Sequence, residues 1–336
     1  MSKPTSGSLG RVVSRREALL GGAGVVALTS IVTGCKRERP IVSTDDVIEE
    51  TDKALVKYHE AEQVAVQVPS PAGIATSHDG SLWVAGDRQV VRLAGGEGVD
   101  RSSRGALPSS AVISGEATCM AAGLGALFIG VGNHVEIVRP NAERAEAWEP
   151  FAPEGLITCI ALGPDTIYLG DSVGRRIVRC DPTGKVIGYM CEKDPKRGYS
   201  GLIVPSPHLD VVVDEEGAVH VVNPGAHKIE IYEPDGSPRW SWGEDGQQVQ
   251  GFCGCCNPTD IALLPDGRYV TSEKGIPRVK IYSKQGHFEC VVAGHEDLSP
   301  GVVGLDVAVM SDGRIAVLDK GINAVRVYEP KGQDSA

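Results

Sequence analysis

Three cysteines, Cys253, Cys255 and Cys256, lie within the stretch GFCGCCNPTD, which runs from Gly251 to Asp260. Thiols at this density form disulfides, carry out thiol–disulfide exchange or bind soft metal ions as thiolates. The two glycines and the proline in the same stretch indicate a loop. The sequence therefore predicts a loop that presents thiols for one of these chemistries.

Three interpretations of these thiols stay open. Thiols outside the cytoplasm often oxidise, and the available pairs include the adjacent Cys255 and Cys256. Alternatively, several thiolates hold a metal ion or an iron–sulfur cluster, although the spacing C-x-C-C differs from that of zinc pairs and ferredoxin runs. In the third interpretation the thiols are unconnected. The stretch lacks the C-x-x-C-H sequence that attaches a c-type haem.

The cysteine loop belongs to an internal repeat. Each repeat joins a short apolar run, a turn rich in Asp and Gly, a second apolar run and an alternating third run. The six repeats start at Gly73, Cys119, Cys159, Asp210, Asp260 and Asp306. Alternation with a period of two between such turns indicates β-strands. The starts lie about 40 to 50 residues apart, which is the length of a four-stranded propeller blade.

Six such repeats predict an all-β, six-bladed β-propeller around a channel, with a pair of packed β-sheets as the alternative. The last repeat has three strands before the sequence reaches EPKGQDSA. The alternating stretch EQVAVQV, Glu62–Val68, precedes the first blade and has no blade of its own. We expect this N-terminal strand to close the last blade as its outermost strand, because that pairing removes an open sheet edge.

Two segments, NPTDIALLPDGRYVTSE and GLDVAVMSDGRIAVLDKGINAVRVYEPKG, resemble the repeat of NHL-repeat six-bladed propellers. The likeness extends over most of the chain after the first 60 residues or so, at the blade-length period. It implies the fold but no function, because propellers host binding modules, scaffolds and enzymes alike. The GCCNP sequence is similar to a motif in a subset of bacterial propellers, and it stands where relatives carry a Gly-Gln-Phe-type turn.

Propeller topology predicts where the thiols lie. The outermost strand of one blade ends, and the innermost strand of the next begins, on the same face of the ring. The loop with the three neighbouring cysteines makes this connection between blades four and five. Cys119 and Cys159 open inner strands, and Cys191 ends the outer strand of blade three. We therefore predict that these six thiols cluster on one face near the channel mouth. Cys119, Cys159 and the three loop cysteines are expected to act there as one redox or metal-binding site.

Acidic residues in the repeat offer an alternative site. Asp210, Asp260 and Asp306 share one register at the channel, and His208 stands two residues before the first of them. Some six-bladed propellers are metal-dependent lactonases or lyases, and these four residues have the chemistry to hold a hard divalent ion. In a structural interpretation, each Asp instead caps a blade-to-blade turn. No nucleophile elbow, phosphate loop or His-x₃-His pair is present, so a binding or scaffold module is favoured over an enzyme.

The N-terminus indicates export. Arg15 and Arg16 precede an apolar run that ends in VTGC at Cys35, which resembles a twin-arginine signal with a lipobox. The apolar run is shorter than the ~20 residues of a membrane span. The predicted parts are a signal peptide (1–34), a tether that begins with lipidated Cys35 (35–53) and the propeller (54–336). The protein is therefore expected in the periplasm or at the cell surface.

The net charge of −11 bears on the partners. It gives no basic surface for nucleic acid, and membrane contact is expected through the lipid anchor. An extracytoplasmic protein, acting in redox chemistry, is the expected partner. A thiolate-bound metal ion or iron–sulfur cluster is the one cofactor that the residues point to.

Overall fold

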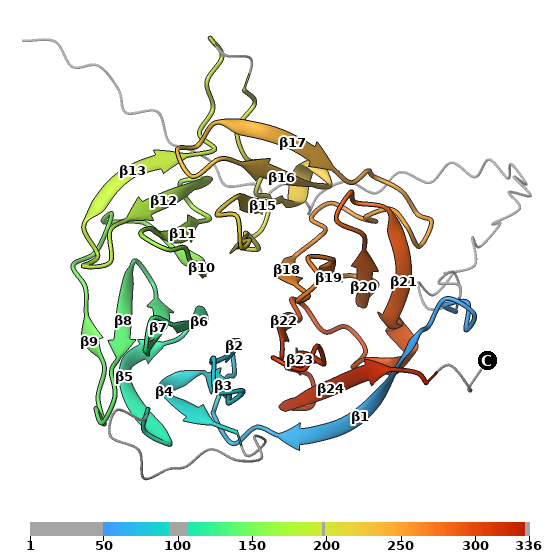
Figure 1. Cartoon of the computed structure of the whole chain (residues 1–336), viewed down its shortest axis with the longest axis horizontal. Coiled ribbons are helices and arrows are strands. Elements are labelled where there is room, and N and C mark those ends of the chain that lie inside the picture. The colour runs from blue at the N-terminus through green and yellow to red at the C-terminus, as the bar shows by residue number, and fades with distance from the viewer. Residues whose placement is uncertain (1–49, 94–106, 197–198, 333–336) are drawn as a thin grey trace, which may run out of the picture. The chain divides into compact units, whose positions relative to one another are not determined.

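The protein is described by a computed structural model over residues 50–93, 107–196 and 199–332. The expected signal peptide and lipidation site, with Arg15, Arg16 and Cys35, lie outside these residues. Within the described ranges, no helix is long and apolar enough to cross a membrane. The unit Ile48–Ala336 contains every strand of the described chain (Figure 1).

The strands form six four-stranded antiparallel sheets that stand around a channel as the blades of a propeller (Figure 1). Blade one consists of β2 (Gly73–Thr76), β3 (Leu82–Ala85), β4 (Asp87–Arg92) and β5 (Ser110–Glu116). Blade two consists of β6 (Cys119–Gly123), β7 (Ala126–Val131), β8 (His134–Val138) and β9 (Glu146–Ala147). Blade three consists of β10 (Ile157–Leu162), β11 (Ile167–Asp171), β12 (Arg176–Cys180) and β13 (Val186–Met190). The predicted six-bladed fold is confirmed.

The remaining blades follow the same order from the channel outward. Blade four consists of β14 (Val211–Val213), β15 (Val219–Asn223), β16 (Lys228–Tyr232) and β17 (Pro238–Trp242). Blade five consists of β18 (Asp260–Leu263), β19 (Tyr269–Glu273), β20 (Arg278–Tyr282) and β21 (Phe288–Ala293). Blade six consists of β22 (Asp306–Val309), β23 (Ile315–Asp319), β24 (Ala324–Pro330) and β1 (Tyr58–Ala65).

The N-terminal strand closes the ring, as the sequence predicts. β1 pairs antiparallel with β24, from Tyr58 opposite Pro330 to Ala65 opposite Ala324. The strand lies a few residues earlier than the expected Glu62–Val68. After the buried Tyr58, its next five residues are exposed at the sheet edge, where alternation of apolar residues is not needed. Val66 and Val68 follow the strand and are buried in the core between blades six and one.

The turns between first and second strands show why the repeat folds in this way. In blade five, Asp266 Oδ1 accepts a hydrogen bond from the Arg268 N–H at 3.1 Å. Gly267 lies between them with φ of 80°, a left-handed conformation that glycine adopts without a steric penalty. The second strands that follow the turns are buried along their whole length, and their apolar side chains fill the spaces between blades.

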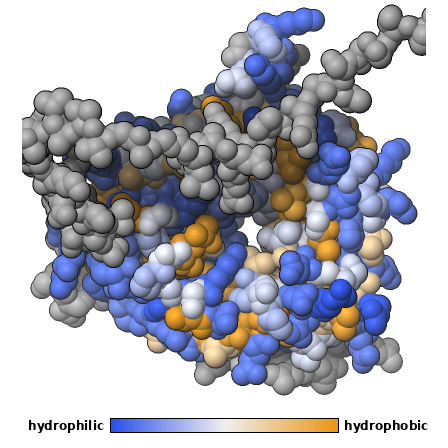
Figure 2. All heavy atoms as spheres, turned by 180° about the vertical axis from the view of Figure 1, so that it is seen from behind, coloured by the Kyte–Doolittle hydropathy of each residue, from blue (hydrophilic) through white to orange (hydrophobic). Residues whose placement is uncertain are grey.

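The innermost strands of all six blades line the channel, which holds a cavity of about 390 Å³. Figure 2 shows the opening from the face opposite to that of Figure 1, with hydrophobic side chains gathered beside it on a mostly hydrophilic surface. The first residues of the innermost strands therefore meet around one end of the channel, where the acids and two of the cysteines of the repeat register lie.

Candidate functional site

The three repeat-register aspartates join neighbouring blades. Each accepts a hydrogen bond from an innermost-strand N–H of the following blade: Asp210 from Ile261 (2.7 Å), Asp260 from Val307 (3.4 Å) and Asp306 from Ile74 (2.5 Å). The structural interpretation of these acids is thus supported, with one correction. They link the innermost strands of adjacent blades directly, because the strands converge at the channel and bring each carboxylate within reach of the next backbone.

The same three carboxyl groups crowd each other. Burial, followed by the charge of Asp306, raises the pKa of Asp210 to about 7. Burial, followed by the charges of Asp210 and Asp306, raises the pKa of Asp260 well above its ordinary value. Asp260, and Asp210 in part, therefore keep their protons near neutral pH. His208 lines the same channel-mouth cavity as the three carboxyl groups, and its ring lies against Gly304.

Cys119 and Cys159 also line the channel, but as buried thiols. Each sulfur lies over a glycine on the neighbouring strand, Cys119 over Gly130 and Cys159 over Gly170, where any Cβ would collide with it. Burial raises the pKa of both thiols well above the ordinary range. A thiol held in its neutral form is a poor metal ligand, so this pair behaves as packing.

Cys191 departs from the expected position at the channel mouth. It ends the outer strand of blade three, but its side chain is buried in the core between blades three and four, beside Tyr232. The topological argument placed the end of the strand correctly, and the left-handed backbone at Cys191 (φ 64°) accompanies a side chain directed into the core. The predicted cluster of six thiols is therefore not assembled at the channel mouth.

The three loop cysteines lie together and differ in exposure. Cys255 is exposed, Cys253 is half-buried, and Cys256 is 3% exposed. The sulfurs of Cys255 and Cys256 lie 3.1 Å apart as free thiols. Across the described residues, no three His, Cys, Asp or Glu side chains are placed to hold a metal ion. The arrangement thus suits chemistry between two neighbouring thiols better than metal coordination.

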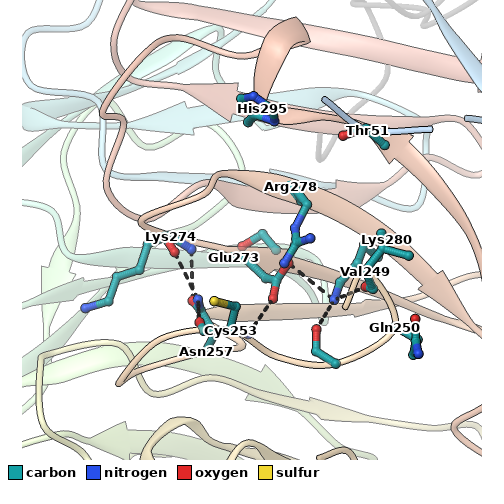
Figure 3. A network of polar contacts seen from close by, with 12 residues as sticks. Thr51, Val249, Gln250, Cys253, Asn257, Glu273, Lys274, Arg278, Lys280 and His295 are labelled. Atoms are coloured by element: carbon teal, nitrogen blue, oxygen red, sulfur yellow. Dashed lines mark hydrogen bonds and ion pairs between the residues drawn. The ribbon is translucent and has the colours of Figure 1, made fainter. Parts of the chain in front are cut away.

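A buried ionic network holds the first part of the cysteine loop (Figure 3). Glu273 at the end of β19 pairs with Arg278 at 2.8 Å and with Lys280 at 3.2 Å, and it lies 3.4 Å from the Cys253 N–H. Lys280 Nζ donates to the carbonyl oxygens of Val249 and Gly251 at 3.0 and 2.8 Å. Because Lys280 and Glu273 are fully buried, these bonds form in a low-dielectric setting and restrain the loop strongly.

Asn257 holds the second part of the loop. Its side chain accepts a hydrogen bond from the Lys274 N–H and donates one to the Lys274 carbonyl, both at 2.9 Å. The Lys274 side chain points away from the Glu273 network in Figure 3, and its Nζ donates to Ser206 Oγ at 2.7 Å. The two thiols are therefore carried on a restrained loop, with a lysine ammonium and a serine hydroxyl beside Cys256.

The groups around the two thiols shift their pKa values in opposite directions. Burial raises the pKa of Cys256, but hydrogen bonds from Ser206 and Cys255 and the charge of Lys274 outweigh it, so the pKa lies below the ordinary value. The hydrogen bond to Cys256, and then its charge, raise the pKa of Cys255. The pair therefore loses its first proton easily and holds the remaining proton between two sulfurs. Such a monoanion is the reactive form of a dithiol.

The channel mouth lies next to this pair. A cavity of about 230 Å³ is lined by His208, Lys320 and the three aspartates, together with the first residues of the inner strands. Burial, followed by the charges of Lys274 and Lys320, lowers the pKa of His208 to about 4. The mouth thus presents a neutral imidazole and the Lys320 ammonium group, with Lys274 close enough for its charge to act on His208.

Sequence reasoning missed Ser206, Lys274 and Lys320. The two lysines do leave a signal, because both directly follow the acid that ends the second strand, in SEK and in LDK. Ser206 leaves none, since it comes from the long connection into blade four and meets Lys274 through the fold alone.

Comparison with known proteins supports the fold. No protein-family profile and no curated protein matches the sequence. The WD40 β-propeller domain of Doa1 is similar in structure, with a TM-score of 0.53 and 15% identity over 82% of this chain and 98% of that domain. A streptogramin B lyase matches with a TM-score of 0.52 and 11% identity, over 83% of this chain and all of the lyase. Virginiamycin B lyase from Staphylococcus aureus matches with a TM-score of 0.52 and 13% identity, over 82% of this chain and all of that protein.

Identities this low establish the fold class alone. The chain is an all-β, six-bladed propeller, and the loop between blades four and five carries the neighbouring thiol pair.

Proposed function

We propose that the protein is a thiol–disulfide redox carrier, in which the Cys255–Cys256 pair is the redox centre of a propeller scaffold. The observation that carries this proposal is the 3.1 Å contact between the two sulfurs, with Lys274 and Ser206 beside the buried one. The exposed sulfur is open to a substrate, and the buried sulfur is placed to resolve the intermediate.

The step involves one substrate disulfide and two electrons. The Cys255 proton passes to the Cys256 thiolate, and the Cys255 sulfur attacks one sulfur of the substrate disulfide. A mixed disulfide forms, and the first substrate thiolate leaves. The Cys256 thiol gives up its proton to solvent, and its sulfur attacks Cys255, which closes the Cys255–Cys256 disulfide and expels the second thiolate. The dithiol is oxidised, and the two substrate thiolates take up protons from solvent. A partner dithiol reverses the sequence and becomes a disulfide itself.

The proposal extends to the location and the type of propeller. An NHL-type propeller, exported by a twin-arginine signal and lipidated at Cys35, carries the centre outside the cytoplasm, where an extracytoplasmic redox protein reduces it. The repeat register and the VTGC sequence support this part. Replacing Arg15 and Arg16 together by Lys is expected to block export, and Cys35→Ala to release the protein from the membrane. Unchanged membrane retention of Cys35→Ala would argue against the lipid anchor.

The decisive experiment for the redox centre is the double variant Cys255→Ser with Cys256→Ser. Wild-type protein treated with a disulfide is expected to lose two thiols and two mass units in the peptide that contains both cysteines. The double variant keeps the remaining described thiols reduced, because five of them are buried. Cys180→Ser is the matched control, since that thiol is buried in blade three. Formation of the mixed disulfide without closure of the pair would contradict the proposal.

A second candidate is a metal-dependent hydrolase or lyase. Its support is the gathering of Asp210, Asp260 and Asp306 with His208 around the channel, in a fold shared with two proteins named as lyases. The test is a panel of lactones and esters with added calcium, zinc or manganese. Activity that is lost in Asp260→Asn, with unchanged folding, would promote this function over the redox carrier.

A further inference from the structure

We propose that the disulfide substrate of the Cys255–Cys256 pair is a small molecule that bears a carboxylate, and that the channel mouth receives this carboxylate. The inference rests on the redox function proposed above and names the substrate class of the same site.

The thiol pair and the channel mouth are joined by three consecutive residues. Ser206 lies beside Cys256 and accepts the hydrogen bond from Lys274. Pro207 and His208 follow directly and line the mouth cavity. Two residues of chain span at most about 7 Å. A substrate sulfur at the exposed thiol and a carboxylate in the mouth are therefore within the reach of one small molecule.

The mouth has the charge for an anion. Lys320 lines the cavity, and its positive charge lies close enough to His208 to lower the pKa of that imidazole. Lys274 adds a second positive charge from the side of the thiol pair. The His208 ring is neutral at pH 7, so it offers a hydrogen bond without a competing charge. The Lys320 ammonium group at this opening, with the Lys274 charge beside it, attracts a carboxylate and raises its rate of association.

The floor of the mouth carries less negative charge than its three aspartates would suggest. Asp210, Asp260 and Asp306 line it, but burial and crowding raise the pKa of Asp210 to about 7 and that of Asp260 well above its ordinary value. Their remaining charge is engaged by the backbone N–H groups of the neighbouring blades. The cavity of about 230 Å³ accommodates several water molecules of ~30 Å³ each, or one carboxylate arm in their place.

Three disulfides with the same two-carbon arms and different end groups test the inference. They are 3,3′-dithiodipropionate (anionic), 2-hydroxyethyl disulfide (neutral) and cystamine (cationic). Full-length protein is mixed with each, quenched with acid, and the loss of two mass units in the Cys255–Cys256 peptide gives the rate constant. The variants are Lys320→Gln, which changes the mouth, and Lys284→Gln, a lysine on the β20–β21 turn of blade five, as the matched control.

We expect wild-type protein to react at least about tenfold faster with dithiodipropionate than with cystamine, at the lower end of electrostatic rate enhancements. Lys320→Gln should lower the dithiodipropionate rate several-fold and leave the hydroxyethyl disulfide rate unchanged, and Lys284→Gln should change neither. Equal rates for all three disulfides would overturn the inference, and so would a preference that Lys320→Gln does not alter. The redox function would stand in either case, with a partner protein rather than a small carboxylate as the substrate. Failure of every disulfide to oxidise the pair overturns the redox function itself.

Discussion

Lys274 Nζ donates a 2.7 Å hydrogen bond to Ser206 Oγ, and this contact joins the end of β19 in blade five to the connection that enters blade four. Cys256 lies against both residues. The charge of the thiol pair is therefore stabilised by two blades as well as by the loop that carries it, and it depends on the closed ring.

Lys274→Met is expected to make the thiol pair less reactive. Loss of the ammonium charge raises the pKa of Cys256 toward its ordinary value, so less thiolate is present at pH 7. The rate of alkylation of the pair by iodoacetamide should fall roughly threefold to tenfold at pH 7, and its pH profile should move to higher pH. Lys274→Arg retains the positive charge and should keep most of the rate. Equal alkylation profiles for the wild-type protein and the Lys274→Met variant would contradict the role of this lysine.

Lys280→Met is expected to destabilise blade five. The change leaves the carbonyl oxygens of Val249 and Gly251 without their buried donor and leaves Glu273 with Arg278 as its ionic partner. Unsatisfied buried groups of this kind cost about 2–4 kcal/mol of unfolding free energy. Urea unfolding measures the loss, and Lys284→Met, on an exposed turn, should change the free energy by less than about 0.5 kcal/mol. A similar small effect at both positions would show that the network does not restrain the loop.

Asp210→Asn is expected to change how stability depends on pH. The pKa of Asp210 in the folded protein is about 7, above the unfolded value of 3.8, so the folded state binds more protons between these values. Stability from this group is present below about pH 4 and is lost as pH rises to about 7. Relative to wild type, Asp210→Asn should therefore gain up to about 2–4 kcal/mol between pH 4 and pH 7. The Asn amide oxygen can still accept the hydrogen bond from the Ile261 N–H, so the variant removes the titration and keeps this contact. Parallel plots of stability against pH for the two proteins would refute the raised pKa of Asp210.

Deletion of Tyr58–Ala65 is expected to destabilise the propeller far more than deletion of residues 36–49. Without β1, the β24 edge loses its ladder of hydrogen bonds and Arg326 loses its contact with Glu60 at 2.6 Å. The melting temperature should drop by about 10 °C or more, and aggregation should rise. Both quantities come from thermal scans with light scattering, and equal melting temperatures for the two deletions would be inconsistent with the observed closure.

The fold could be predicted from the sequence because the pattern of strands and turns recurs six times. The Asp-Gly turns and the alternating runs give the same strand assignment six times, and the unassigned strand before blade one has one open edge to pair with. The bounds of β1 were less accessible. Apart from the buried Tyr58, the first part of this strand is exposed and mostly polar, whereas the apolar Val66 and Val68 resemble strand residues but lie in the core after it.

The candidate site could be predicted from the sequence only in part. Chain topology correctly placed the cysteine loop between blades and the first residues of inner strands at the channel. It gave no information on side-chain direction, so Cys191 was expected at the mouth although it packs beside Tyr232. The partners of Cys256 come from segments far apart in sequence, Ser206 and Lys274, and such a meeting depends on how neighbouring blades pack.

The pairing of β1 with β24 also sets an order of events in time. Residues 58–65 leave the ribosome more than 250 residues ahead of their partners at 324–330. No hydrogen bond of this sheet edge can form until the partner strand has been synthesised, and the loop to be closed is long, which makes closure slow. The five other blades can form while synthesis continues. β1 is therefore synthesised before the other strands but is the last to pair.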